Sequence, residues 1–376
     1  MELTLRRAEL VMVELPLRTP WRTSAGTIDR KPVLLVHVLT SAGEGWAECA
    51  AMPAPDYTGE HVDGALDVLR NWLIPERLAS GPMEPGMTPL PTSVRGHQMA
   101  RAALDEALLD ARLRAEGRSL AQFLGVTATR VPAGVALGLP PSAANGDRSA
   151  IASETRAAVS RAVDEGYRRV RLKIDRGIEA DLIAAARVVA PEFELMADGN
   201  GAYTSADVNL LTALDAHHLA CIEQPLASTD LLGHRDLAKR IATSIALDEP
   251  LDSPDAVAIA LELSACSAVN LKRARVGGMA NAVAAHDLCR ARRADLWIGG
   301  MLESAVGRAA NIALAALPGC TLIADLSPST RLFSDDLAAP FEIHDGMVSV
   351  PDAPGVSPWP EQSRLEALGA VTITVD

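Results

Sequence analysis

The chain has 376 residues, 48% of them hydrophobic and 22% charged, which is typical of a globular protein long enough for two domains. The formal net charge of −13, without a dense lysine and arginine cluster, disfavours nucleic-acid binding. Apolar runs are too short to span a membrane, and the first residues lack the apolar core of a signal peptide, so we expect a cytoplasmic protein with no membrane partner.

The first 130 residues are predicted to form an α+β domain. Within residues 1–50 apolar residues alternate as in strands, around a loop at residues 19–27 that is rich in Pro, Gly and hydroxyl side chains. Residues 60–125 show helical spacing, interrupted by a Pro- and Gly-rich loop at residues 80–93. We therefore expect a small antiparallel sheet with helices packed against it.

From residue 131 to 334, short apolar runs alternate with Ala-rich helical stretches. The runs cover residues 133–137, 170–174, 195–197, 219–222, 245–247, 268–271, 296–298 and 322–324. This alternation predicts parallel strands joined by helices, and eight units predict an α/β fold of the (β/α) TIM-barrel type. An open doubly wound sheet is the alternative, but no Gly-x-Gly-x-x-Gly motif follows the first run.

Residues 335–376 form the last predicted segment. Most of it is Pro-rich and irregular, and it ends in an alternating stretch over Val371–Val375. We expect this stretch to return to the first domain and complete it, as a cap on the barrel.

Five charged residues end five consecutive predicted strands. They are Lys173, Asp198, Glu223, Asp248 and Lys272. Their regular spacing corresponds to one βα unit, roughly 25 residues in a barrel of this size. We therefore expect the five side chains to stand together at the C-terminal mouth of the barrel, where catalytic groups of such barrels converge.

The three carboxylates at this mouth predict a metal site. Converging carboxylates repel one another and stay ionised when a cation lies between them. Oxygen ligands from Asp198, Glu223 and Asp248 favour Mg²⁺, for which Mn²⁺ can substitute. Coordination positions left open would accept a substrate carboxylate and stabilise the enediolate that forms when its α-proton leaves.

Lys173 and Lys272 flank the carboxylates and are the candidate bases. A free lysine has a pKa of about 10.4. A dication, a guanidinium such as Arg171 or Arg275, and partial burial would lower it toward the ~7–8 that suits a base. A single acidic residue after a strand is more often a helix cap, and a barrel lysine can also form a Schiff base. The shared phase of all five residues favours a joint site.

At these residues the chain resembles the enolase superfamily, muconate-lactonizing subgroup. Within it, the chain is similar to the o-succinylbenzoate synthase and N-acylamino acid racemase family. The matching segments are Arg-Leu-Lys-Ile (171–174), Asp-Gly-Asn (198–200), Ile-Glu-Gln-Pro-Leu (222–226), Leu-Asp-Glu (247–249), Asn-Leu-Lys (270–272), Gly-Gly-Met-Leu-Glu (299–303) and Arg-Thr-Ser-Ala-Gly-Thr (22–27). The resemblance covers nearly the whole chain.

The resemblance implies a role for each matching residue. Asp198, Glu223 and Asp248 would bind Mg²⁺, while Lys173 and Lys272 would act on opposite faces of the substrate. Support for these groups would come from Arg171, Asn200, Glu249 and Arg275. The walls of the substrate pocket would come from Thr23, Thr27, Tyr57, Thr58, Gly299, Gly300, Met301 and Glu303.

Two arginines carry further information. Many members of the family have lysine where Arg171 stands, so the chain departs from the pattern beside the base Lys173. Arg275 matches a position that accompanies racemase activity in the family, and a cation there would lower the pKa of Lys272. Racemisation needs proton exchange at both faces, so both lysines must be competent.

The implied function is Mg²⁺-dependent synthesis of o-succinylbenzoate for menaquinone, with racemisation of N-acylamino acids, including N-succinylamino acids, in the same site. A dedicated racemase is the alternative, and dipeptide epimerase is disfavoured because Asp325-Leu326-Ser327 stands where those enzymes show Asp-x-Asp. Mandelate racemase chemistry is disfavoured because no His ends the seventh strand. A Schiff-base aldolase and a non-catalytic barrel are the alternatives from other classes. The partners would be a small carboxylate substrate and further copies of this chain.

Overall fold

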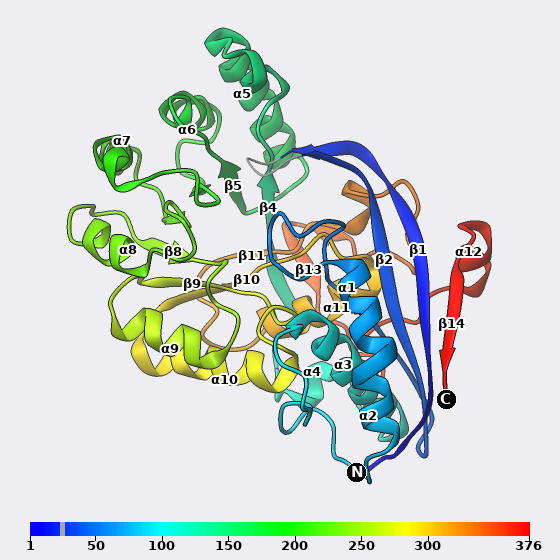
Figure 1. The fold of residues 1–376 in the computed structure, drawn as a ribbon. Helices are drawn as coiled ribbons and strands as arrows, with labels where there is room; N and C mark the ends of the chain where they lie inside the picture. The colour runs from blue at the N-terminus through cyan, green and yellow to red at the C-terminus, as the bar shows by residue number, and fades with distance from the viewer. Residues whose placement is uncertain (23–26) are drawn as a thin grey trace.

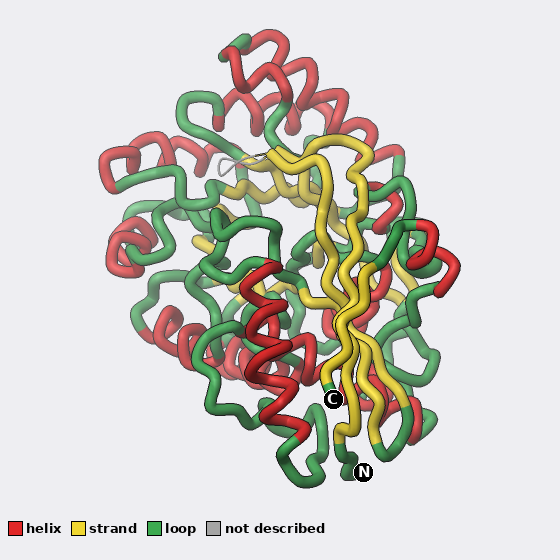
Figure 2. The backbone as a smooth tube through the Cα atoms, turned by 45° about the vertical axis from the view of Figure 1, so that its right-hand side comes forward, coloured by secondary structure: helices red, strands yellow, loops and turns green. Residues whose placement is uncertain are grey.

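A four-stranded antiparallel sheet lies across one side of the molecule in the computed structural model, which describes residues 1–22 and 27–376 (Figure 1). Its strand order is β14-β1-β2-β3, with bounds β14 (Val371–Val375), β1 (Leu5–Arg22), β2 (Thr27–Thr40) and β3 (Glu44–Cys49). The hairpin β1–β2 appears as two long strands that run from near the termini to the far end of the barrel (Figure 2). The loop predicted over residues 19–27 therefore begins later, because β1 continues to Arg22.

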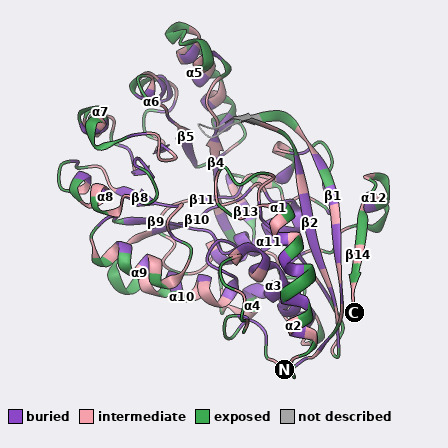
Figure 3. Ribbon diagram, viewed as in Figure 1, coloured by how far each residue is buried: buried purple, intermediate pink, exposed green. Residues whose placement is uncertain are grey.

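Helices cover the inner face of this sheet. They are α1 (Val62–Val68), the π-helix η1 (Leu69–Leu73), α2 (Ile74–Leu78), α3 (Gln98–Ala115) and α4 (Leu120–Phe123). α3 packs on β2 and β3 on one side and on α10 of the barrel on the other, so nearly all of it is buried (Figure 3). An α+β capping region was expected here, and the structure confirms it.

Eight parallel strands form the barrel. They are β4 (Arg130–Leu137), β5 (Arg169–Lys173), β6 (Glu194–Asp198), β7 (Cys221–Glu223), β8 (Ile245–Leu247), β9 (Ala268–Leu271), β10 (Asp295–Ile298) and β11 (Ala324–Asp325). Each of β4 to β10 pairs with the next, and β11 pairs with β4. The backbone N–H of Leu322 donates to the carbonyl of Leu296 at 3.0 Å, which links β10 to the segment before β11 and closes the ring. The predicted barrel is thus confirmed.

Helices alternate with these strands and surround the ring. The main ones are α5 (Arg148–Asp164), α6 (Glu179–Val189), α7 (Val208–Ala213), α8 (Leu231–Ala238), α9 (Pro254–Glu262), α10 (Met279–Arg292) and α11 (Ala305–Ala315). Short 3₁₀ turns lie at η2 (Pro141–Asn145), η3 (Ser205–Asp207), η4 (Leu214–His217) and η5 (Ser329–Arg331). In the described part of the chain, no helix combines the length and hydropathy needed to cross a bilayer.

The last segment contacts both parts of the molecule. β12 (Ile343–His344) and β13 (Met347–Ser349) form a hairpin, and β13 pairs antiparallel with the start of β4. After α12 (Gln362–Ala367), β14 pairs antiparallel with β1 and completes the capping sheet, as predicted. The division of the chain at residues 130 and 334 stays a prediction.

The barrel interior is apolar at one end and charged toward the other. Met196, Cys221, Ala246, Ala268 and Trp297 form a buried plug. Above the plug, β5 turns Arg169, Arg171 and Lys173 inward, and the facing strand β4 makes room with Gly134. A Cβ at Gly134 would lie only 2.7 Å from Arg169 Nε. The packing therefore directs charge to the mouth, where the strands end.

Candidate active site

The strand register brings the predicted charged residues together. Lys173 pairs with Asp198 across β5 and β6, and Asp198 pairs with Glu223 across β6 and β7. Asp248 and Lys272 directly follow β8 and β9. Because parallel strands end at the same edge, these five side chains lie at the C-terminal mouth, and the three carboxylates are almost fully buried.

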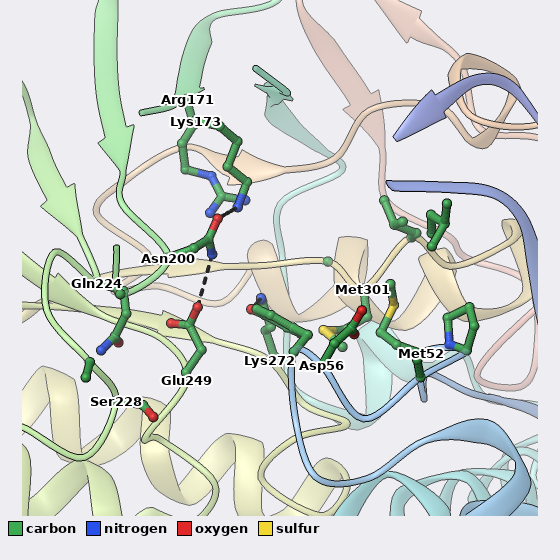
Figure 4. Close-up of a pocket in the computed structure, with 18 residues that line it drawn as sticks. Met52, Asp56, Arg171, Lys173, Asn200, Gln224, Ser228, Glu249, Lys272 and Met301 are labelled. Atoms are coloured by element: carbon green, nitrogen blue, oxygen red, sulfur yellow. Dashed lines mark hydrogen bonds between the residues drawn. The ribbon is translucent and has the colours of Figure 1, made fainter. Parts of the chain in front are cut away.

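On the β5 side, cations separate the carboxylates. Lys173 Nζ donates to Asp198 Oδ2 at 2.6 Å and also to Asn200 Oδ1. Arg171 pairs with Asp198 Oδ2 at 2.7 Å and with Glu223. Asn200 in turn donates to Glu249 at 3.0 Å, so Arg171, Asn200 and Glu249 all support the charged layer, as Figure 4 shows for Lys173, Asn200 and Glu249.

On the β9 side, Lys272 lies beneath an aromatic ring. Its Nζ donates to Asp248 Oδ2 at 2.7 Å and to the Tyr57 hydroxyl at 2.6 Å. The Tyr57 ring centroid lies 5.0 Å from Lys272 Nζ and 5.1 Å from Arg275 Cζ, and Arg275 pairs with Asp248. Burial lowers the pKa of Lys272; Asp248 opposes this shift and Arg275 adds to it.

The donor set fits a hard dication such as Mg²⁺. Burial raises the pKa of Glu223 to about 8; Arg171 opposes the rise, and Asp198 and Asp248 add to it. Such crowding of buried oxygen ligands is what a divalent cation relieves. With their oxygens turned to Arg171 and the lysines, no three acidic, His or Cys side chains among residues 1–22 and 27–376 converge as a metal cage. Metal binding therefore requires these side chains to turn toward the ion.

A cavity of about 350 Å³ opens above the charged layer, between Lys173 and Lys272 (Figure 4). Its polar floor contains Arg171, Asn200, Gln224 and Glu249, and its apolar wall comes from both the cap and the barrel. That wall contains Ile28, Met52, Pro53, Met301 and Leu302. A small carboxylate with an apolar substituent fits this distribution.

Three residues of this cavity have left-handed backbone. Asn200, Gln224 and Leu302 have φ of 42°, 38° and 59° in the loops that follow β6, β7 and β10. Non-glycine residues rarely adopt this conformation, which clusters at functional sites. Gln224 was not among the predicted site residues, although it directly follows Glu223; its Oε1 accepts from the Asp248 N–H at 3.1 Å.

The other predicted pocket residues are placed unevenly. Gly300, Met301 and Tyr57 line the cavity, and Gly299 packs against Lys272 just below it. Glu303 does not face the substrate space: it is buried, pairs with Arg308 at 3.3 Å and accepts from Asn311. Its predicted role is corrected to a structural one, because α11 supplies these partners.

The cap loops could be tested only in part. Thr23 lies outside the described residues, and Thr27 begins β2. Thr58 donates to the Glu60 carbonyl at 3.0 Å and so shapes its own loop. Ile28, Met52 and Leu302 were missed because their apolar side chains carry no chemical signal in the sequence.

This fold and this charged mouth define an enolase-type barrel enzyme. Residues 154–359 match the family model described as "Enolase C-terminal domain-like", and residues 6–125 match the "Mandelate racemase / muconate lactonizing enzyme, N-terminal domain". The chain belongs to this mandelate racemase and muconate lactonizing enzyme family of the enolase superfamily.

Individual relatives span nearly the whole chain. An N-succinylamino acid racemase of Amycolatopsis sp is 43% identical over 94% of this chain and 95% of that protein. An o-succinylbenzoate synthase of Bacillus subtilis (strain 168) is 36% identical over 94% and 93%. A crystal structure of an enolase superfamily member from Listeria innocua Clip11262 superimposes with a TM-score of 0.92 at 34% identity, covering 99% of both chains.

Proposed function

We propose that this chain is a Mg²⁺-dependent o-succinylbenzoate synthase that also racemises N-succinylamino acids in the same site. The observation that carries the proposal is the placement of Lys173 and Lys272 on β5 and β9, on either side of three buried carboxylates. Relatives with both printed activities, at 36–43% identity, support it. Both reactions begin with loss of a proton next to a carboxylate, so one site can serve both.

Lys173 would remove the α-proton, and the electron pair of that bond would move toward the substrate carboxylate. Mg²⁺, held by Asp198, Glu223 and Asp248, would supply positive charge opposite the charge that develops there. In dehydration the pair then forms a C=C bond while the β C–O bond breaks, and protonated Lys173 gives its proton to the leaving hydroxide as water forms. In racemisation Lys272 instead delivers a proton to the opposite face.

The surroundings of Lys272 suit this second role. Tyr57 and Asp248 hold its Nζ, while burial and Arg275 keep its pKa below the ordinary value. A lysine so placed exchanges protons more readily near neutral pH than an exposed one. This supports a two-base reaction.

Asp325 argues for acylated substrates over free amines. Its two oxygens accept from Arg169 at 2.8 Å and from Arg171 at 2.7 Å. These arginines lower its pKa to about 2 although burial alone would raise it. A carboxylate neutralised by two guanidiniums does not attract a substrate ammonium group, so dipeptide epimerisation is disfavoured.

The test is turnover of N-succinyl-phenylglycine in D₂O, with α-proton exchange followed by proton NMR and racemisation by polarimetry. We expect Lys173→Ala and Lys272→Ala each to lower racemisation by about 10²–10⁴-fold. EDTA should abolish exchange, and a dehydration assay should depend on Lys173. Lys239→Ala, on the exposed surface of the chain, is the control. Exchange that persists in EDTA, or borohydride trapping of substrate on a lysine, would instead support the Schiff-base alternative.

We also propose that the enzyme acts in the cytoplasm as a homo-oligomer. This rests on the commonly multimeric barrels of the family that the sequence resembles. Size-exclusion chromatography with light scattering tests the assembly: a single species at the monomer mass of 39.6 kDa would contradict it.

A further inference from the structure

A second cavity, of about 580 Å³, lies beside the first. It is bounded by α5, by the ends of β4 and β5, and by Thr19 and Pro20 of β1. Figures 1 and 2 both show this end of the β1–β2 hairpin reaching over to the α5 side of the barrel. Lys173 lines both cavities, so they meet at the proposed base.

Small side chains keep this junction open. Ala136 of β4 pairs in register with Arg171 of β5 and therefore faces the barrel interior at the same level. Gly138 follows at the next inward position, and both residues line the second cavity. A larger side chain at either place would separate the cavity from Lys173.

The second cavity carries excess positive charge. Its wall contains the guanidiniums of Arg161 on α5 and Arg331 in η5, besides Lys173 at its inner end. Within the described residues neither arginine forms an ion pair; Arg331 donates to the Ala136 carbonyl at 3.4 Å, and its Cζ lies 5.8 Å from the Tyr167 ring centroid. The one carboxylate of this wall, Glu154, already accepts from the Ser142 N–H at 3.1 Å and the Ser142 hydroxyl at 2.9 Å.

We infer that the second cavity binds a carboxylate at the far end of the substrate's acyl chain, paired with Arg331 and Arg161. This rests on the proposed function and deepens it: the preferred substrates are dicarboxylates, with one carboxylate over the charged layer and the other in the second cavity. The apolar substituent then occupies the first cavity, against Met52 and Met301. Guanidinium–carboxylate pairs are among the stronger polar contacts in proteins, so they discriminate against a neutral acyl chain.

The experiment compares binding of N-succinyl-phenylglycine and N-butanoyl-phenylglycine, which has a similar chain length but no distal charge. Calorimetry with Mg²⁺ gives both affinities for wild type, Arg331→Met, Arg331→Lys and Arg161→Met. Arg156→Met is the matched control, because Arg156 lies on the same helix, is exposed, and does not line the cavity. Proton NMR in D₂O gives KM and kcat for the same pairs.

We expect wild type to bind the succinyl ligand at least 10-fold more tightly than the butanoyl ligand. Arg331→Met should remove most of this preference by raising KM for the succinyl compound alone; Arg161→Met should remove part of it, and Arg331→Lys should restore part. A preference that is missing in wild type, or kept in both methionine variants, overturns the inference. If the preference follows the arginines but no α-proton exchanges, the anion site stands and the proposed function fails.

Discussion

Gly299 packs so closely against the catalytic layer that a single methyl group would displace Lys272. A Cβ at this position would lie 2.0 Å from Asn270 Oδ1 and 2.9 Å from Lys272 Cε. Asn270 cannot easily move away, since its Nδ2 donates to Glu223 at 2.7 Å. The glycine is therefore required by close approach to the proposed acid–base residue.

We predict that Gly299→Ala lowers kcat for racemisation by about 10–100-fold with little change in KM, because an ångström-scale shift of a reacting group costs about that much. Steady-state polarimetry measures this. Gly81→Ala is the control, as a Cβ there meets nothing within 4 Å. An unchanged kcat would show that Lys272 does not depend on this packing.

At the residue scale, the sequence predicted the charged side chains and missed the apolar ones. Asp198, Glu223 and Asp248 could be assigned because the repeat of the barrel fixes where each strand ends. Met52 and Ile28 could not, since their contact with the cavity depends on how the cap sits over the barrel.

Among the elements, α3 and α10 meet at an ionisable contact. Asp105 of α3 is fully buried against Gly278, the residue before α10, with a Cβ-to-Oδ2 distance of 2.8 Å if Gly278 had a side chain. Neither Asp105 oxygen has a hydrogen-bond partner in the described structure. Burial, with the neighbouring Glu106, raises the pKa of Asp105 to about 8, so below that pH the carboxyl is protonated.

The pH dependence of stability follows from this shift. In the unfolded chain Asp105 has a pKa of about 3.9, so between that pH and about 8 the folded state binds one more proton. Its contribution to the free energy of unfolding is therefore fully present below pH ~4 and is lost as the pH rises to about 8. We predict that Asp105→Asn, which cannot ionise, loses less Tm between pH 5 and pH 8 than wild type. Calorimetric scans at both values test this, with exposed Asp352→Asn as control; parallel curves would contradict it.

The elements also show where local patterns mislead. Pro20 and the glycine and hydroxyl residues after it favour a loop, yet β1 continues to Arg22 with an irregular register between Pro16 and Trp21. Proline lacks an N–H, so the ladder breaks there but the strand resumes. Tertiary pairing with β2 outweighs the local preference.

In the whole molecule, cap and barrel are joined through one buried carboxylate. Glu48 of β3 pairs with the fully buried Lys31 at 3.3 Å. The same carboxylate accepts from the Ser304 N–H at 2.9 Å and from the Gly307 N–H at 3.2 Å, at the N-terminus of α11. The residues before Ser304 form a wall of the active-site cavity, so this contact fixes the cap over the site.

We predict that Glu48→Gln lowers the free energy of unfolding by about 3–5 kcal/mol, since it leaves the Lys31 ammonium buried without a counter-charge. Urea unfolding followed by circular dichroism measures the loss, and exposed Glu2→Gln serves as control. Adding Lys31→Met to Glu48→Gln should recover part of it. A double variant less stable than the single one would mean that the Lys31 ammonium is not the source of the loss.

The barrel and the returning C-terminal strand could be read from the sequence because both follow from periodicity. The buried polar contacts between cap and barrel could not. Glu106, for example, pairs with Arg273, next to Lys272, yet it stands in a helix where a charged residue normally indicates an exposed face. Only the packing of α3 between sheet and barrel explains why such charges are buried.

The pairing of β14 with β1 has a consequence for synthesis on the ribosome. β1 emerges with the first residues, whereas Val371–Val375 follow only after the whole barrel has been made. At 5–20 residues per second the delay is roughly 20–70 s. Throughout that time one edge of the nascent capping sheet keeps its backbone donors and acceptors unpaired, which exposes the newborn chain to strand exchange with its neighbours on the same polysome.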